Sequence, residues 1–141
     1  MPPTTIDPAL PSPAHPGPAR ILYAEDLREL REVMTIIVET QGYAIETVHD
    51  GAAALDRLTA EPAAFDLLIT DHHMPGVNGL ELVRRLAATA FKGRILVFSS
   101  ELDAAVHRAY HALGVALILP KPIRPAVLRK SLADLLSSSP A

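Results

Sequence analysis

Residues 65–79 read FDLLITDHHMPGVNG, and this stretch decides the fold. Residues 65–70 form a nearly continuous apolar run of strand length, which is typical of a strand that helices cover on both faces. Asp71 follows at once, and Asn78 or Gly79 can begin a helix. A covered strand followed by an acid, a short loop and a helix predicts the centre of an α/β sheet.

The same alternation of short apolar runs and longer amphipathic segments continues on both sides of this stretch. The predicted strands are residues 20–24, 43–48, 65–70, 94–98 and 115–119. The predicted helices are residues 27–41, 51–60, 79–90, 101–113 and 125–136. Strict alternation with right-handed helical crossovers favours a parallel sheet with helices on both faces. We therefore predict a doubly wound α/β domain of five strands and five helices.

The chain has the length and apolar content of one domain with short extensions. It has 141 residues, of which 49% are apolar, and this suffices for one core of ordinary size. Residues 1–19 hold seven of the 13 prolines, so we expect a disordered tail or linker there. We assign residues 20–137 to the domain and residues 138–141 to a frayed C-terminus.

Charge and composition exclude several classes of function. A net charge of −3 with both signs interspersed argues against binding to nucleic acid or to an anionic membrane. We find no signal peptide and no apolar run long enough to span a bilayer. The chain has no cysteine, which fits a reducing compartment. We therefore expect a cytoplasmic protein.

Five polar side chains stand where the predicted strands end. Glu25 and Asp26 follow the first strand, Asp71 the third, Ser99 the fourth and Lys121 the fifth. In a parallel sheet these strand ends meet at one edge, where the functional crevice of such folds lies. Three converging carboxylates repel one another unless a cation neutralises them, and oxygen ligands suit Mg²⁺, with Mn²⁺ as a substitute.

This set of groups is what phosphoryl transfer to an aspartate needs. A carboxylate can act as the nucleophile, while a metal ion, a hydroxyl and an ammonium group neutralise the charge of the phosphoryl oxygens. The crevice is therefore interpreted as a site that forms an acyl phosphate.

Four segments resemble the receiver domain of two-component response regulators, over residues 20–137. They are residues 21–26 (ILYAED), 67–79 (LLITDHHMPGVNG), 95–100 (ILVFSS) and 120–123 (PKPI). The resemblance implies the flavodoxin-like strand order 2-1-3-4-5. It also implies a module that catalyses only its own phosphorylation and slow dephosphorylation, and is not otherwise an enzyme.

By matching position, the resemblance implies a metal site and a phosphoacceptor. Asp71 would accept the phosphoryl group. Asp26 and Asp71 would bind the metal directly, and Glu25 would bind it mainly through water. The backbone carbonyl of His73 would complete the protein ligands.

The remaining two groups would act on the phosphoryl group itself. Ser99 would hydrogen-bond its oxygens and move toward them on phosphorylation. Lys121 would pair with the acyl phosphate, and the Lys121–Pro122 bond is often cis in this family.

Two positions depart from the usual pattern of the family. Ile118 stands where an aromatic residue usually swings inward on phosphorylation. Tyr110 or Phe98 could take over this role, although an aromatic ring at either position more often only packs in the core or on the surface. His73 replaces a residue that often controls how water reaches the acyl phosphate, so we expect it to modulate the lifetime of the phosphate.

The resemblance also implies partners. A histidine kinase or a histidine phosphotransfer protein would donate the phosphoryl group. Phosphorylation would switch the face formed by the fourth helix, fifth strand and fifth helix, which would bind a downstream protein. Residues 124–141 hold one predicted helix and a short end, so we expect no output domain after the receiver. A stand-alone regulator and the terminal receiver of a hybrid kinase both fit this expectation.

Two other functions and one other metal site remain open. A Mg²⁺-dependent phosphatase with an Asp nucleophile would need a second Asp at the position of His73. A degenerate receiver would act only as a binding module. Zinc could be bound by His72 and His73 or by His107 and His111, but the simpler interpretation places His72 in an exposed loop and the other pair on a solvated helix face.

Overall fold

The computed structural model describes residues 17–100 and 103–137 as five strands that alternate with five α-helices. The strands are β1 (Arg20–Ala24), β2 (Ala44–Val48), β3 (Leu67–Asp71), β4 (Arg94–Ser99) and β5 (Leu117–Pro120). The helices are α1 (Arg28–Thr40), α2 (Gly51–Ala60), α3 (Gly79–Leu86), α4 (Ala104–Ala112) and α5 (Pro125–Ser137), with a 3-10 turn at Pro62–Ala64. The doubly wound α/β prediction is confirmed.

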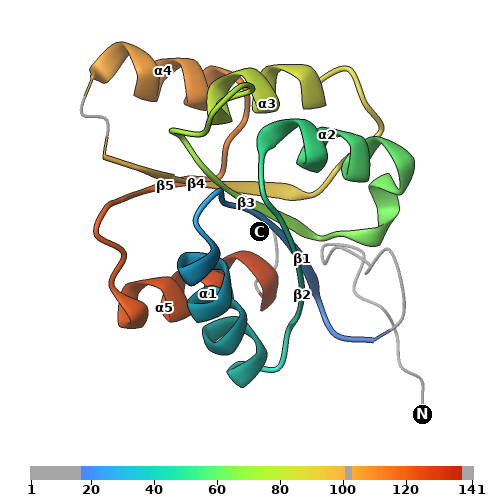
Figure 1. The fold of residues 1–141 in the computed structure, drawn as a ribbon, viewed down its shortest axis with the longest axis vertical. Helices are drawn as coiled ribbons and strands as arrows, with labels where there is room; N and C mark the ends of the chain where they lie inside the picture. The colour runs from blue at the N-terminus through green and yellow to red at the C-terminus, as the bar shows by residue number, and fades with distance from the viewer. Residues whose placement is uncertain (1–16, 101–102, 138–141) are drawn as a thin grey trace.

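All the strands are parallel, and their order is β2-β1-β3-β4-β5. This is the predicted order 2-1-3-4-5. Helices α2, α3 and α4 cover one face of the sheet, and α1 and α5 cover the other (Figure 1). Because β3 lies at the centre and is buried along its whole length, its apolar sequence meets a helical layer on each side.

The sheet separates two apolar cores. The core beneath α2, α3 and α4 includes Leu22, Leu58, Leu68, Leu82 and Tyr110. The core beneath α1 and α5 includes Tyr23, Met34, Ile69, Phe98 and Leu128. Alternate residues of a strand point to opposite faces, so neighbours such as Leu22 and Tyr23 contribute to different cores.

Local signals explain where two of the helices begin. The Asp50 carboxylate accepts a hydrogen bond from the backbone N–H of Ala53 at 2.7 Å, and this caps α2. The Asn78 side chain accepts one from the N–H of Glu81 at 2.9 Å, and this caps α3. Both are N-caps of the kind that satisfy the unpaired N–H groups of a first turn.

Several predicted boundaries were wrong by a few residues. The central strand begins at Leu67 rather than at residue 65, and it includes Asp71. Helix α3 ends at Leu86 rather than near residue 90, and β5 begins at Leu117 rather than at residue 115. Helix α4 begins after its cap, Asp103; residues 101–102, along with most of the predicted tail and the predicted C-terminal end, lie outside the described residues.

Within residues 17–100 and 103–137, no helix is long and apolar enough to span a membrane.

Candidate functional site

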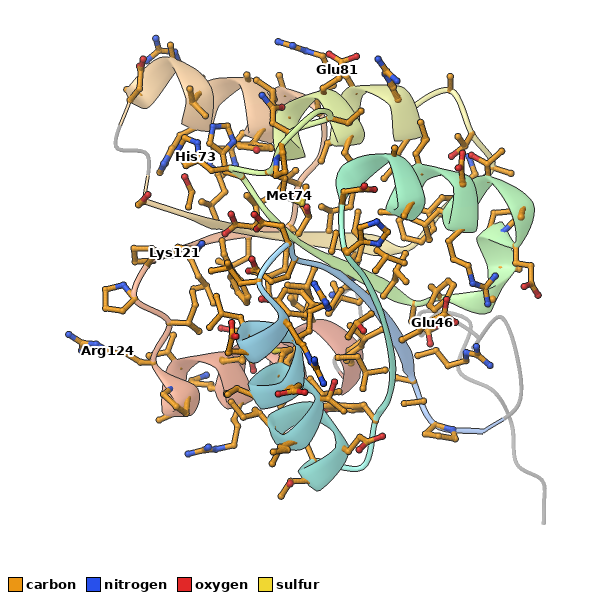
Figure 2. All side chains as sticks on the ribbon, in the orientation of Figure 1. Glu46, His73, Met74, Glu81, Lys121 and Arg124 are labelled. Atoms are coloured by element: carbon orange, nitrogen blue, oxygen red, sulfur yellow. The ribbon has the colours of Figure 1, made fainter. Side chains whose placement is uncertain are left out.

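The carboxyl ends of β1, β3, β4 and β5 bring the five predicted polar residues to one edge of the sheet. Glu25 directly follows β1, Asp71 and Ser99 end β3 and β4, and Lys121 directly follows β5. Asp26 is exposed, whereas Glu25, Asp71 and Ser99 are buried. Figure 2 shows the Lys121 side chain pointing toward this edge, below the loop that carries His73 and Met74.

Asp71 and Lys121 form the centre of the site. The Lys121 ammonium contacts Oδ1 of Asp71, and the exposed fractions of the two side chains are 30% and 3%. No described group donates a hydrogen bond of ordinary geometry to this oxygen, so the ammonium contact is a contact between charges. The site therefore has a buried carboxylate oxygen in contact with a positive charge. This arrangement suits a metal ion or an incoming phosphoryl group.

Glu25 is held by hydrogen bonds from several elements. The Tyr23 hydroxyl donates to its Oε1 at 3.0 Å, and the Leu27 N–H donates to its Oε2 at 3.2 Å. The Arg31 guanidinium donates to its backbone carbonyl at 2.8 Å. Burial, followed by the hydrogen bond with Asp26, raises the pKa of Glu25. With both oxygens engaged, Glu25 suits a metal contact through water.

Tyr23 is a site residue that the sequence analysis missed. It is 2% exposed, and its ring packs edge-on against Phe98, with 6.1 Å between the ring centroids. Burial and the nearby charge of Glu25 raise the pKa of the Tyr23 hydroxyl well above the usual range. The hydroxyl therefore stays protonated and acts as a hydrogen-bond donor. The sequence contains a signal for this role, because Tyr23 precedes Glu25 by two residues and residues two apart on a strand point to the same side.

The loop after Asp71 is tied to its surroundings through His72, and the prediction that His72 is exposed was wrong. His72 is 7% exposed. Its N–H donates to the carbonyl of Phe98, and its carbonyl accepts from the N–H of Gly79, both at 2.9 Å. Its Nδ1 contacts the hydroxyl of Tyr110, which is fully buried on α4. The ring was predicted to face solvent because its partner lies 38 residues away in the sequence.

The neighbouring residue His73 behaves differently. Its side chain is exposed, and its ring packs against that of His72 with 4.7 Å between centroids. Together with Met74, Pro75 and Asn78 it lines a surface hollow of about 340 Å³. The His73 ring therefore lies at the surface, two residues after Asp71 in the chain.

Ser99 and Ile118 complete the edge on the side of β5. The N–H of Lys121 donates to the carbonyl of Ser99 at 3.1 Å, which links the two predicted phosphoryl-binding residues. The Lys121–Pro122 bond is cis, as the resemblance implied. Ile118 is half-buried opposite Val97 and packs against the core that contains Tyr110.

The donor groups at this edge fit Mg²⁺ better than zinc. Among residues 17–100 and 103–137, no group of three or more His, Asp or Glu side chains is arranged to hold a metal ion by itself. A small hard cation that keeps several waters needs only one or two carboxylates, and Asp71 and Asp26 can supply these. Zinc prefers imidazole and thiolate ligands, and the Nδ1 of His72 is engaged with Tyr110.

The fold and the site together define a class of protein. A five-stranded flavodoxin-like sheet carries acids after β1 and β3, a hydroxyl at the end of β4 and a lysine after β5 at one edge. The family model of the response regulator receiver domain matches residues 21–133. The chain therefore belongs to this family of phosphoacceptor regulators in two-component signalling. A receiver domain of this family is a signalling module rather than an enzyme.

Individual relatives agree with this assignment. The chain is 32% identical over 124 residues to the sensory/regulatory protein RpfC of Xanthomonas campestris pv. campestris, covering 85% of this chain and 17% of that protein. It is 31% identical over 137 residues to the sensor histidine kinase AruS of Pseudomonas aeruginosa, covering 94% and 14%. With the response regulator MprA of Mycobacterium avium the identity is 35% over 103 residues, covering 73% and 44%. The chain thus spans less than half of each of these relatives.

Solved structures show the same fold. The chemotaxis protein CheY4 of Vibrio cholerae superposes with a TM-score of 0.75 at 29% identity, covering 85% of this chain and all of that one. A receiver domain protein of Methanospirillum hungatei superposes with a TM-score of 0.80 at 20% identity, covering 86% and 95%. The second comparison, at this low identity, supports the fold alone.

Proposed function

We propose that Asp71 is the phosphoacceptor and that Lys121 and Ser99 bind the phosphoryl group. The observation that carries this proposal is the contact between the Lys121 ammonium and a buried oxygen of Asp71 that accepts no hydrogen bond from a described group. A carboxylate oxygen can attack phosphorus, and an adjacent ammonium group stabilises the negative charge that develops on the phosphoryl oxygens.

The transfer step exchanges one phosphorus bond for another. A carboxylate oxygen of Asp71 attacks the phosphorus atom of a phosphohistidine, and the P–N bond breaks. The electron pair of that bond stays on the imidazole nitrogen, which takes up a proton, while Asp71 becomes an acyl phosphate. Lys121 would then pair with this phosphate, and the Ser99 hydroxyl would donate a hydrogen bond to one of its oxygens.

The family generally uses Mg²⁺, and the donor set described above fits this ion. Asp26 and Asp71 would hold it directly, Glu25 would hold it through water, and the carbonyl of His73 would complete the protein ligands. When bound, the ion neutralises charge on the phosphoryl oxygens. His73, exposed beside the site, would influence how fast water hydrolyses the acyl phosphate.

Membership of the family implies a histidine kinase partner. The donor would be such a kinase or a histidine phosphotransfer protein, in the cytoplasm. The surface formed by α4, β5 and α5 would bind the downstream protein. Both a stand-alone regulator and a segment of a hybrid kinase stay open, because the relatives include a protein named as a sensor kinase and one named as a response regulator.

The proposal is tested by the mass of the intact protein after incubation with Mg²⁺ and acetyl phosphate. The wild type should gain one phosphoryl group that hydroxylamine removes, and Asp71→Asn should gain none. Asp56→Asn, which changes an exposed carboxylate on α2, is the matched control and should be labelled like the wild type. If the wild type stays unlabelled while another receiver domain is labelled under the same conditions, the chain is a degenerate receiver and the proposal fails.

A further inference from the structure

Helix α4 is held against the rest of the molecule mainly by one residue. Among its residues, Ala104 to Ala112, only Tyr110 is fully buried. Val106 and Leu113, at the end of the helix, pack against the same core but remain partly exposed. A helix with so little buried apolar surface can shift at low energetic cost, so the contacts of Tyr110 largely decide where α4 lies.

The hydroxyl group of Tyr110 contacts His72, the residue next to the proposed phosphoacceptor. The Tyr110 hydroxyl contacts Nδ1 of His72, and the two rings pack edge-on with 5.5 Å between centroids. Both side chains are buried, so this polar contact is shielded from water and contributes more than it would on the surface.

The same hydroxyl also lies against the start of α3. A Cβ atom added to Gly79 would lie 2.8 Å from the Tyr110 hydroxyl and 2.7 Å from the carbonyl oxygen of Asp71. Only a glycine therefore lets α3 approach this closely. The Tyr110 hydroxyl therefore lies where α4 contacts the end of β3 and the start of α3. It packs so closely against Gly79 that no larger side chain fits there.

His72 itself cannot move independently of its neighbours. Its backbone is bonded on one side to Phe98, the residue before Ser99, and on the other side to Gly79. A displacement of His72 is therefore coupled to the end of β4 and the start of α3, and it moves the His72 ring. Because the ring contacts Tyr110, the displacement is passed to the one fully buried residue of α4.

We infer that the contact between Tyr110 and His72 transmits the phosphorylation of Asp71 to α4. The side chain of Ile118 is half-buried and apolar, and it has no aromatic ring that could move inward on phosphorylation. The contact between Tyr110 and His72 would take over this role. This inference rests on the proposed function, because it needs an acyl phosphate on Asp71. Added charge beside His72 shifts the loop, the shift moves Tyr110, and α4 changes its position on the surface proposed to bind the downstream protein.

The test is hydrogen exchange of the α4 backbone in the whole chain, with and without acetyl phosphate. Intact mass, measured on the same samples, gives the phosphoryl occupancy, so variants are compared at equal occupancy. In the wild type, phosphorylation should change the exchange rate across residues 104–112. In Tyr110→Phe this change should be about fivefold smaller, the factor that one hydrogen bond of about 1 kcal/mol is worth.

Two further variants make the result specific. His72→Phe keeps an aromatic ring and removes Nδ1, so it should reduce the response as much as Tyr110→Phe, and the double variant should lose no more than either single one. Tyr43→Phe removes the hydroxyl of a half-buried tyrosine on the other face of the sheet and should respond like the wild type.

The outcomes separate this inference from the proposed function. A wild type that gains no phosphoryl group would overturn both the proposed function and this inference. A labelled wild type whose α4 does not respond, or a Tyr110→Phe protein whose α4 responds fully at equal occupancy, would overturn the inference and leave Asp71 as the phosphoacceptor. If Tyr110→Phe does not fold, His72→Phe alone decides between the same results.

Discussion

Tyr23→Phe should destabilise the domain through the loss of a single buried hydrogen bond. The Tyr23 hydroxyl donates to Oε1 of Glu25 at 3.0 Å, and the exposed fractions of the two residues are 2% and 1%. Phenylalanine keeps the ring and its edge-on contact with Phe98. The substitution therefore leaves the core packed and removes only the donor, so Oε1 of Glu25 loses its partner in a place that water reaches poorly.

The expected cost follows from the charge of the acceptor. A hydrogen bond to an ionised group contributes about 1.5 to 3 kcal/mol, roughly twice the value for a neutral pair. At pH 8 and without metal, the free energy of unfolding of Tyr23→Phe should fall by this amount. With a urea slope of about 1.5 kcal/mol/M, the midpoint of unfolding should fall by about 1 to 2 M.

Equilibrium unfolding in urea, followed by far-UV circular dichroism, measures this difference. Tyr43→Phe is the matched control, because Tyr43 is half-buried against the same core and its hydroxyl bonds to no other described residue. Its midpoint should stay close to that of the wild type. A Tyr23→Phe midpoint within the error of the control would refute the reasoning and would mean that water replaces the hydroxyl at no cost.

Three further predictions concern the same edge. Burial and the hydrogen bond with Asp26 raise the pKa of Glu25, so the stability it contributes is fully present below its ordinary pKa of 4.5 and is lost as the pH rises through the raised value. In EDTA, Glu25→Gln should therefore unfold at higher urea than the wild type at pH 8 but not at pH 4; equal midpoints at pH 8 would contradict this. Gly79→Ala places a methyl group against the carbonyl oxygen of Asp71 and the hydroxyl of Tyr110, which should cost about 1 to 3 kcal/mol in urea unfolding; a neutral result would show that α3 can move away. Adding Mg²⁺ should raise the thermal midpoint of the wild type, because a ligand that binds only the native state stabilises it, and Asp26→Asn should abolish most of this rise; an equal rise in both would place the ion elsewhere.

The fold was predictable because its signals are local and repeated. Five apolar runs separated by amphipathic segments suffice to predict the parallel sheet, and the crossover rule leaves few alternatives. The exact end of β3 was not predictable in the same way. Asp71 pairs with Phe98 in the sheet, yet a buried acid at a strand end cannot be distinguished by pattern from the first residue of a loop.

The site was predictable to the extent that it depends on strand ends. The rule that functional groups gather at the carboxyl edge placed Glu25, Asp71, Ser99 and Lys121 together, and the structure has all four there. The contact of His72 with Tyr110 depends on how α4 packs over the sheet, and no local pattern in a loop reports such a partner. Sequence periodicity therefore predicts which residues stand at the edge, and tertiary packing decides which of them touch.

Two tyrosines, one from each core, place their hydroxyls at this edge. Tyr23 belongs to the core beneath α1 and α5, and Tyr110 belongs to the core beneath α2, α3 and α4. A buried hydroxyl needs a polar partner, and each finds one beside the site, in Glu25 and His72. Burial first, and then nearby charge that includes Asp71, raises the pKa of both hydroxyls. Asp71 contributes to the raised pKa of both hydroxyls, so the charge of the acyl phosphate proposed on Asp71 would act on one buried group from each core.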